Sequence, residues 1–142
     1  MSTEDEVRNA SNQFYAALNK MVNGSSQSLS DIWSHSSSVT TMHPIGGREI
    51  GWKDVWATWD QTAQVASEGQ VRLEDQFIRV FGDLAYEIGV ENAAFRIAGQ
   101  KVSDQVRVTN IYQKENGTWK IIHHHSDLSP AMVEILQKLQ NS

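Results

Sequence analysis

Apolar residues near the start of the chain recur every three or four positions, which is the spacing of one face of an α-helix. The pattern predicts a first helix that Ser2 or Thr3 caps and that Asn23-Gly24 ends. A short helical turn, capped by Ser30, is expected to follow. The inner face predicted for the first helix consists of Val7, Ala10, Phe14, Ala17, Leu18 and Met21.

The next two segments predict a strand and a second helix. Residues 38–43 contain three consecutive β-branched side chains and predict a short strand, which the turn at 44–47 ends. A second helical pattern then places five apolar side chains on one stripe. These side chains are Trp52, Val55, Trp56, Trp59 and Ala63.

From residue 70 onward the pattern indicates long strands separated by turns, of which Asn116-Gly117 is a strong hairpin signal. Pro130 is suited to begin a C-terminal helix. Helices followed by antiparallel strands predict an α+β fold, with the N-terminal helices packed over the concave face of a strongly curved antiparallel sheet. The predicted strands are 71–81, 84–97, 102–114 and 118–127.

Composition narrows the functional classes. The 142 residues suit a single domain over 1–142. A formal net charge of -5 argues against binding to nucleic acid or to an anionic membrane. Without cysteine, neither a disulfide nor a thiolate zinc site is possible. The first residues lack the apolar core of a secretory signal, and no apolar run approaches the ~20 residues that span a bilayer, so we expect a cytoplasmic protein.

Polar residues on the predicted strands indicate a candidate site, because a buried polar group costs free energy unless it is paired. Strand alternation places the amide of Asn110 on an otherwise apolar face. The same alternation places His124 on one face with Ile122 and Ser126. His43 ends the first predicted strand.

Three consecutive histidines raise the question of a metal site. Because side chains alternate along a strand, His123, His124 and His125 cannot all converge on one ion. A site would need His123 with His125, or His124 with His43, and a carboxylate such as Asp127. We therefore expect no metal. His123 and His125 are interpreted as surface or dimer-interface residues, and Asp127 as accepting a hydrogen bond from one of them.

Three segments carry a resemblance to known families. Residues 13–19 and 39–46 resemble the opening of ketosteroid isomerases. Residues 117–126 resemble the closing strand of SnoaL-like proteins and of the association domain of calmodulin-dependent kinase II. The resemblance implies the cone-shaped fold of the NTF2-like superfamily and a homodimer formed through the open sheet face. It implies no single function, because this superfamily holds isomerases, dehydratases, hydrolases and oligomerisation modules.

The isomerase resemblance also implies which positions would be catalytic. The general-base position is His43 here, the oxyanion tyrosine position is Phe14, and the buried-acid position is Asn110. Tyr15 is adjacent but about 100° round the helix. Because phenylalanine cannot donate a hydrogen bond, steroid isomerisation by that mechanism is not expected. The arginines of the kinase association domain are also missing, since the matching positions are Asn110 and Ser126.

Two functions from different classes follow. The favoured interpretation is a non-catalytic, cofactor-free domain that binds a small apolar or carbonyl-containing molecule or only dimerises. The alternative is a cofactor-independent isomerase, lyase or hydrolase in which His43 is the general base, Asn110 polarises a carbonyl and His124 is a second acid or an orienting donor. The predicted ligand contacts are Phe14, Tyr15, Trp33, Trp56, Trp59, Glu91, Tyr112 and Ser126.

Overall fold

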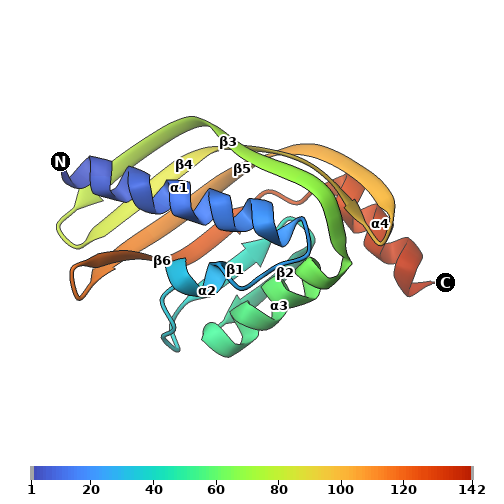
Figure 1. Cartoon of the computed structure of the whole chain (residues 1–142), viewed down its shortest axis with the longest axis horizontal. Helices are drawn as coiled ribbons and strands as arrows, with labels where there is room; N and C mark the ends of the chain where they lie inside the picture. The colour runs from blue at the N-terminus through green and yellow to red at the C-terminus, as the bar shows by residue number, and fades with distance from the viewer. Residues whose placement is uncertain (1, 142) are drawn as a thin grey trace.

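The longest helix, α1 (Thr3–Met21), lies across the inner face of a curved sheet (Figure 1). The structure is a computed structural model and describes residues 2–141. Ser2 caps α1, as the sequence predicts. Its hydroxyl accepts a hydrogen bond from the Asp5 backbone N–H at 3.1 Å, and the Asp5 carboxylate accepts one from the Ser2 backbone N–H at 3.3 Å. The predicted inner face is buried, together with Ser11 and Tyr15.

The sheet has six strands in the order β2-β1-β6-β5-β4-β3. All neighbours run antiparallel except β1 and β6, which run parallel. The sheet is thus mostly antiparallel, as predicted, and the long chain between β1 and β6 allows their parallel pairing. The strands are β1 (Thr40–His43), β2 (Gly46–Ile50), β3 (Ala66–Phe81), β4 (Leu84–Ile97), β5 (Gln100–Glu115) and β6 (Thr118–Ser126).

Strand β2 is absent from the sequence prediction, which treated residues 44–47 only as the end of a strand. Gly46 and Gly47 have φ of 100° and 87°, a region open to glycine at no steric cost. The chain therefore reverses there, and the residues that follow pair with β1.

Two bulges bend β3 around the interior. Its pairing with β4 is irregular between Ser67 and Gln70 and again between Glu74 and Phe77. Asp75, inside the second irregularity, has φ of 55°. Because an extra residue bends a strand and resets its alternation, Gln76 becomes part-buried while Phe77 is exposed.

Three further helices complete the fold, namely α2 (Leu29–Ile32), α3 (Trp52–Val65) and α4 (Pro130–Gln140). Ser30 was predicted to cap the short turn, but it lies inside α2, and Ser28 occupies the N-cap position. Helix α4 begins at Pro130 as predicted, and Figure 1 shows it at the end of the molecule opposite the N-terminus. None of the helices within residues 2–141 is long and apolar enough to cross a membrane.

The buried stripe of α3 is narrower than the sequence indicates. Val55, Trp59 and Ala63 are buried, at a spacing of four residues. Trp52 and Trp56 are only part-buried and pack on each other, with ring centroids 5.5 Å apart. They occupy the neighbouring row of the helix, which lies at the edge of the core.

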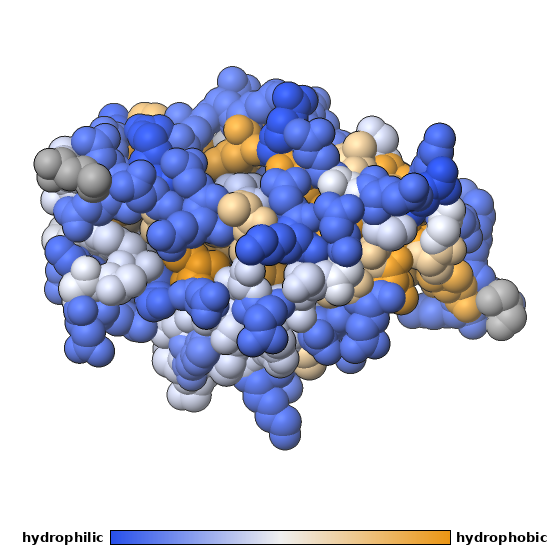
Figure 2. Space-filling model, in the orientation of Figure 1, coloured by the Kyte–Doolittle hydropathy of each residue, from blue (hydrophilic) through white to orange (hydrophobic). Residues whose placement is uncertain are grey.

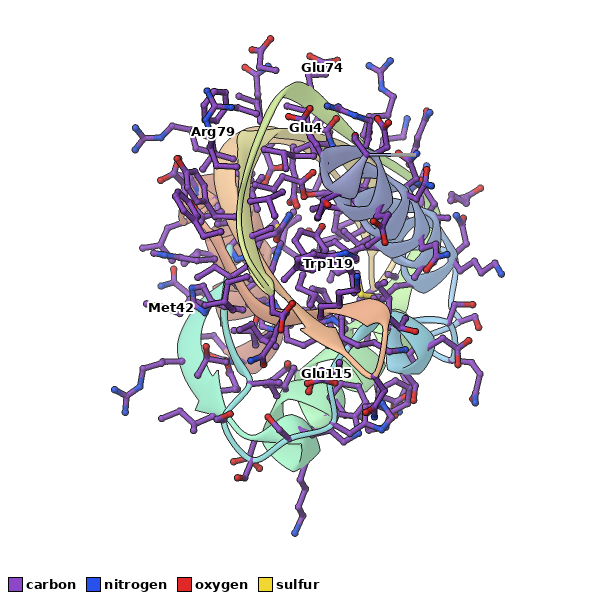
Figure 3. All side chains as sticks on the ribbon, turned by 90° about the vertical axis from the view of Figure 1, so that its left-hand side faces the viewer. Glu4, Met42, Glu74, Arg79, Glu115 and Trp119 are labelled. Atoms are coloured by element: carbon purple, nitrogen blue, oxygen red, sulfur yellow. The ribbon has the colours of Figure 1, made fainter. Side chains whose placement is uncertain are left out.

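Side chains from α1 and the sheet meet inside the curl. Figure 3 shows Trp119 pointing into this space, whereas Met42, Glu74 and Arg79 lie on the outside. Where β3 passes the end of α1, a Cβ on Gly69 would lie 2.3 Å from the Cβ of Phe95, so only glycine fits. Figure 2 shows a mostly hydrophilic surface with hydrophobic residues near the end where α4 lies.

Candidate ligand-binding site

A cavity of about 70 Å³ lies between the C-terminal part of α1, helices α3 and α4, and the inner face of the sheet. One water needs only ~10–15 Å³ of such space, so the cavity has room for part of a small molecule. Four polar side chains, His43, Thr62, Glu91 and His124, interrupt an otherwise apolar lining. The apolar lining consists of Leu18, Met21, Val22, Pro44, Ile45, Trp59, Val71, Ala93, Phe95, Ile97 and Met132.

His43 is held at the end of β1 by a side chain of α3. Its Nε2 lies 2.8 Å from the Thr58 hydroxyl, and that hydroxyl donates its proton to the Val55 carbonyl at 2.8 Å. The Thr58 oxygen therefore accepts from His43 Nε2–H, which leaves Nδ1 with the lone pair. Within residues 2–141, Nδ1 has no hydrogen-bond partner. Burial lowers the pKa of His43 to about 4, so the ring is neutral at pH 7.

His124, on β6, is held by Asn110 on β5. The Asn110 amide nitrogen donates to Glu87 Oε1 at 3.0 Å and to the Tyr15 hydroxyl at 3.1 Å. A carboxylate only accepts, so the amide orientation is fixed and Asn110 Oδ1 faces His124 Nδ1 at 2.6 Å. The proton of neutral His124 is therefore on Nδ1. Burial lowers the pKa of His124 well below its ordinary value, and the charges of nearby histidines lower it further.

Glu87 is fully buried and organises this network from β4. It accepts hydrogen bonds from Asn110 at 3.0 Å, from the Tyr112 hydroxyl at 2.8 Å and from Gln76 at 2.6 Å. Gln76 in turn accepts a hydrogen bond from Arg8 on α1. Glu87 is not among the site residues predicted from the sequence. A signal was available, since Glu87 is directly opposite Asn110 in the sheet register and a charged residue there needs partners.

Glu91 is the second buried carboxyl group of β4, and it lines the cavity. The Tyr15 hydroxyl donates to its Oε2 at 2.7 Å. Burial raises the pKa of Glu91 to about 7, although the hydrogen bond from Tyr15 opposes the rise. Near neutral pH this carboxyl group can therefore either give or take a proton.

Four of the predicted site residues, His43, His124, Trp59 and Glu91, line the cavity together. The centroid of the Trp59 ring lies 4.5 Å from that of His43 and 5.5 Å from that of His124. Asn110 is buried on the inner face of the sheet, as predicted, but does not line the cavity. Both of its N–H groups are used by Glu87 and Tyr15, so it has none with which to polarise a carbonyl.

The other predicted ligand contacts lie outside the cavity lining. Phe14 and Trp33 pack in the core, Trp56 packs on Trp52, and Ser126 is buried near the end of β6. Tyr112 and Tyr15 lie behind the cavity, where each donates to a buried glutamate. Tyr15, rather than Phe14, therefore brings a hydroxyl next to Asn110.

The remaining part of β6 also departs from simple alternation. A bulge lies in its pairing with β5 between Ile111 and Tyr112, so that Ile122 has no partner in the register. Ile121, not Ile122, is therefore buried on the face of His124.

Asp127 binds Arg107 at 2.7 Å instead of a histidine, which corrects the expected partner. His123 instead bonds to Thr40, with its Nδ1 lying 2.7 Å from the threonine hydroxyl. Across residues 2–141, no three His, Asp or Glu side chains are grouped closely enough to hold a metal ion.

Comparison with known proteins identifies a family and a fold. The profile of the SnoaL-like domain matches residues 7–132. No curated protein gives a significant match. A candidate dehydratase of the NTF2-like family from Streptomyces avermitilis superposes with a TM-score of 0.78 and 24% identity, over 90% of this chain and 96% of that one.

Domains associated with calmodulin-dependent kinase II are also similar in structure. The hub domain from S. rosetta superposes with a TM-score of 0.72 and 17% identity, over 91% of this chain and 98% of that one. A candidate association domain from Xanthomonas campestris superposes with a TM-score of 0.71 and 21% identity, over 88% of this chain and 86% of that one. At these identities the likeness establishes the α+β NTF2-like fold.

Proposed function

This chain belongs to the SnoaL-like domain family, and we propose that it is a small-molecule-binding domain whose ligand occupies the cavity between α1, β4 and α4. The supporting observation is the combination of apolar walls with His43, Glu91 and His124 in one buried space. A core that only packs has no need of three ionisable groups, because burying them costs free energy. Apolar pockets with a few convergent polar groups are the usual form of ligand sites.

Ligand binding in the cavity is tested with small apolar ligands and with a variant that fills the cavity with a larger side chain. We expect benzene and cyclohexanone to raise the melting temperature of the wild-type protein, since a ligand at 100 times its Kd stabilises by about 2.7 kcal/mol. Ala93→Met places a larger side chain in the cavity wall and should abolish this increase. Ala85→Met changes a buried alanine on the same strand outside the cavity and is the control. Equal responses in both variants would contradict the proposal.

A second candidate function, proton transfer without a cofactor, is supported by Glu91 rather than by His43. A general base works best when its pKa lies near the working pH. The pKa of Glu91 is about 7, whereas that of His43 is about 4, which makes the imidazole a weak base. Because Asn110 has no free N–H, no donor is available at that position to stabilise an enolate. Ligand binding without catalysis is therefore better supported than proton transfer.

We further propose that two copies pair through the outer face of the sheet. An apolar patch on β3 and β4 consists of Phe77, Phe81, Leu84 and Ile88, which are 40%, 66%, 45% and 42% exposed. Tyr86 lies among them and stacks on Phe81 with ring centroids 6.1 Å apart. The occupant proposed is a second copy, because structural relatives are hub and association domains and self-complementary dimers are the commonest assemblies.

Ile88→Arg is expected to convert a dimer to a monomer in sedimentation velocity experiments, since it places a charge within the apolar patch. Val65→Arg is the matched control, because Val65 is also 42% exposed but lies at the end of α3, away from the patch. A wild-type protein that sediments as a monomer, or an Ile88→Arg variant that stays dimeric, would overturn this assignment.

A further inference from the structure

We propose that the cavity binds a neutral molecule with a hydroxyl group on a small apolar ring or chain, such as a phenol or an alcohol, and that its hydroxyl donates to the unpaired nitrogen of His43 or His124. The inference rests on the proposed ligand-binding function and adds the chemical class of the ligand. The hydrogen-bond directions around the two imidazoles, one unpartnered donor and the charges of the lining support it.

The two imidazoles are held in opposite tautomers. His43 donates through Nε2 to Thr58, and His124 donates through Nδ1 to Asn110. Each ring therefore has one nitrogen that can only accept, and the ring centroids are 6.3 Å apart. Within residues 2–141 no side chain donates to either of these nitrogens. The protein thus provides two acceptors in the cavity lining.

Neither imidazole can change its tautomer without losing the hydrogen bond that it donates. The Thr58 proton is committed to the Val55 carbonyl, so Thr58 has only an acceptor for His43. Transfer of the His124 proton to Nε2 would place a lone pair against Asn110 Oδ1 at 2.6 Å. Asn110 cannot turn to relieve this contact, because its amide nitrogen is bound to Glu87. No side chain of the described residues can therefore supply the missing donor, and in the proposed complex the ligand hydroxyl supplies it.

Trp59 distinguishes a hydroxyl from an ammonium group. Its indole N–H is buried and has no hydrogen-bond partner in the part of the chain that the structure describes. The ring lines the cavity and contacts both histidines. In the proposed complex a hydroxyl donates to an imidazole and accepts from this N–H, which is covered by protein in the ligand-free structure, whereas an ammonium group has no acceptor.

The charges of the lining disfavour anions. Among the described residues that line the cavity there is no lysine or arginine, and the one carboxyl group is that of Glu91. A carboxylate ligand would meet this group and two imidazole lone pairs without a compensating charge. The mainly apolar walls suit an uncharged ring or chain.

Calorimetric titration of the wild-type protein with phenol and with toluene tests the inference, because the two molecules have nearly the same shape and differ in the hydroxyl. A pocket that does not pair the hydroxyl favours toluene, since phenol loses its bonds to water. We expect phenol to bind at least about threefold more tightly. If toluene binds as tightly as phenol, or benzylammonium binds more tightly than phenol, the proposed ligand class is wrong. The proposed ligand-binding function would still stand in either case. If none of the three binds, the proposed function fails and the ligand class with it.

Trp59→Phe provides a matched variant. It keeps an aromatic ring and removes the N–H, so the ratio of phenol to toluene affinity should fall about threefold. Trp119→Phe is the control, because its indole N–H is also buried and unpartnered among the described residues, yet Trp119 does not line the cavity. A merely structural role for Trp59 would lower both affinities alike and leave the ratio unchanged, a result that would remove Trp59 from the recognition scheme.

Discussion

Asn110→Leu is expected to lower the free energy of unfolding by about 3–5 kcal/mol, because it removes hydrogen bonds from a buried network around the Glu87 carboxylate. The fully buried amide connects Glu87, His124 and Tyr15 through three hydrogen bonds. Leucine is similar in size to asparagine and removes all three hydrogen bonds at once. The His124 N–H is then left without its acceptor, and the Glu87 carboxylate loses one of three donors. Urea unfolding at pH 7 measures the change.

Gln113→Leu is the control for this prediction. Gln113 is on the same strand but is exposed, and the same polar-to-leucine exchange should change stability by at most about 0.5 kcal/mol. If the Asn110 and Gln113 variants were equally stable, the network around Glu87 would not be the stabilising element described here.

Glu91→Gln is expected to change how stability depends on pH. The pKa of Glu91 is about 7 in the folded protein, against an ordinary value of 4.5, because the carboxyl group is buried. The folded state therefore holds this proton more tightly than the unfolded chain does. The resulting stabilisation is complete below pH 4.5 and is lost as the pH rises through 7. Across this window the loss amounts to about 3 kcal/mol, at 1.36 kcal/mol for each pKa unit.

The difference in unfolding free energy between wild type and Glu91→Gln isolates this effect. Glutamine cannot ionise but can still accept the Tyr15 hydrogen bond. The wild type should thus lose about 3 kcal/mol relative to the variant between pH 4.5 and pH 7. Two unfolding curves that stay parallel over this range would show that Glu91 has an ordinary pKa.

His43 has the opposite dependence and so serves as an internal comparison. Its pKa is lowered to about 4 in the folded protein, so the unfolded chain binds the proton more tightly. Stability from this group is present above pH 6.5 and is lost as the pH falls through about 4. Between pH 4.5 and 6.5, rising pH therefore increases the contribution of His43 to the free energy of unfolding and decreases that of Glu91. Only variants at each position can separate the two contributions.

Much of the fold is predictable from the sequence because the turn signals are strong. The pattern identifies the hairpin at Asn116-Gly117 and the helix that starts at Pro130. It misses β2 and the bulges in β3 and β6, since one extra residue leaves no mark on composition but reverses the faces of the side chains that follow. Ile122 was misplaced for this reason.

The candidate site was predictable in part. Alternation along β5 correctly placed Asn110 facing inward, and His124 and His43 are buried beside the same cavity region. The pKa values could not be predicted, because they depend on burial by segments distant in sequence. The register opposite Asn110 indicates Glu87, but not its partner Gln76, which faces inward only because of the bulge at Asp75.

The proposed site depends on two neutral imidazoles that are held in opposite tautomers beside the cavity. Long-range ¹H–¹⁵N NMR of the five histidine side chains, recorded from pH 7 to pH 5, tests it directly. We expect His43 to be protonated on Nε2, His124 to be protonated on Nδ1, and neither ring to titrate over this range. Two rings with the same tautomer, or either ring gaining its charge near its ordinary pKa of about 6.5, would contradict it.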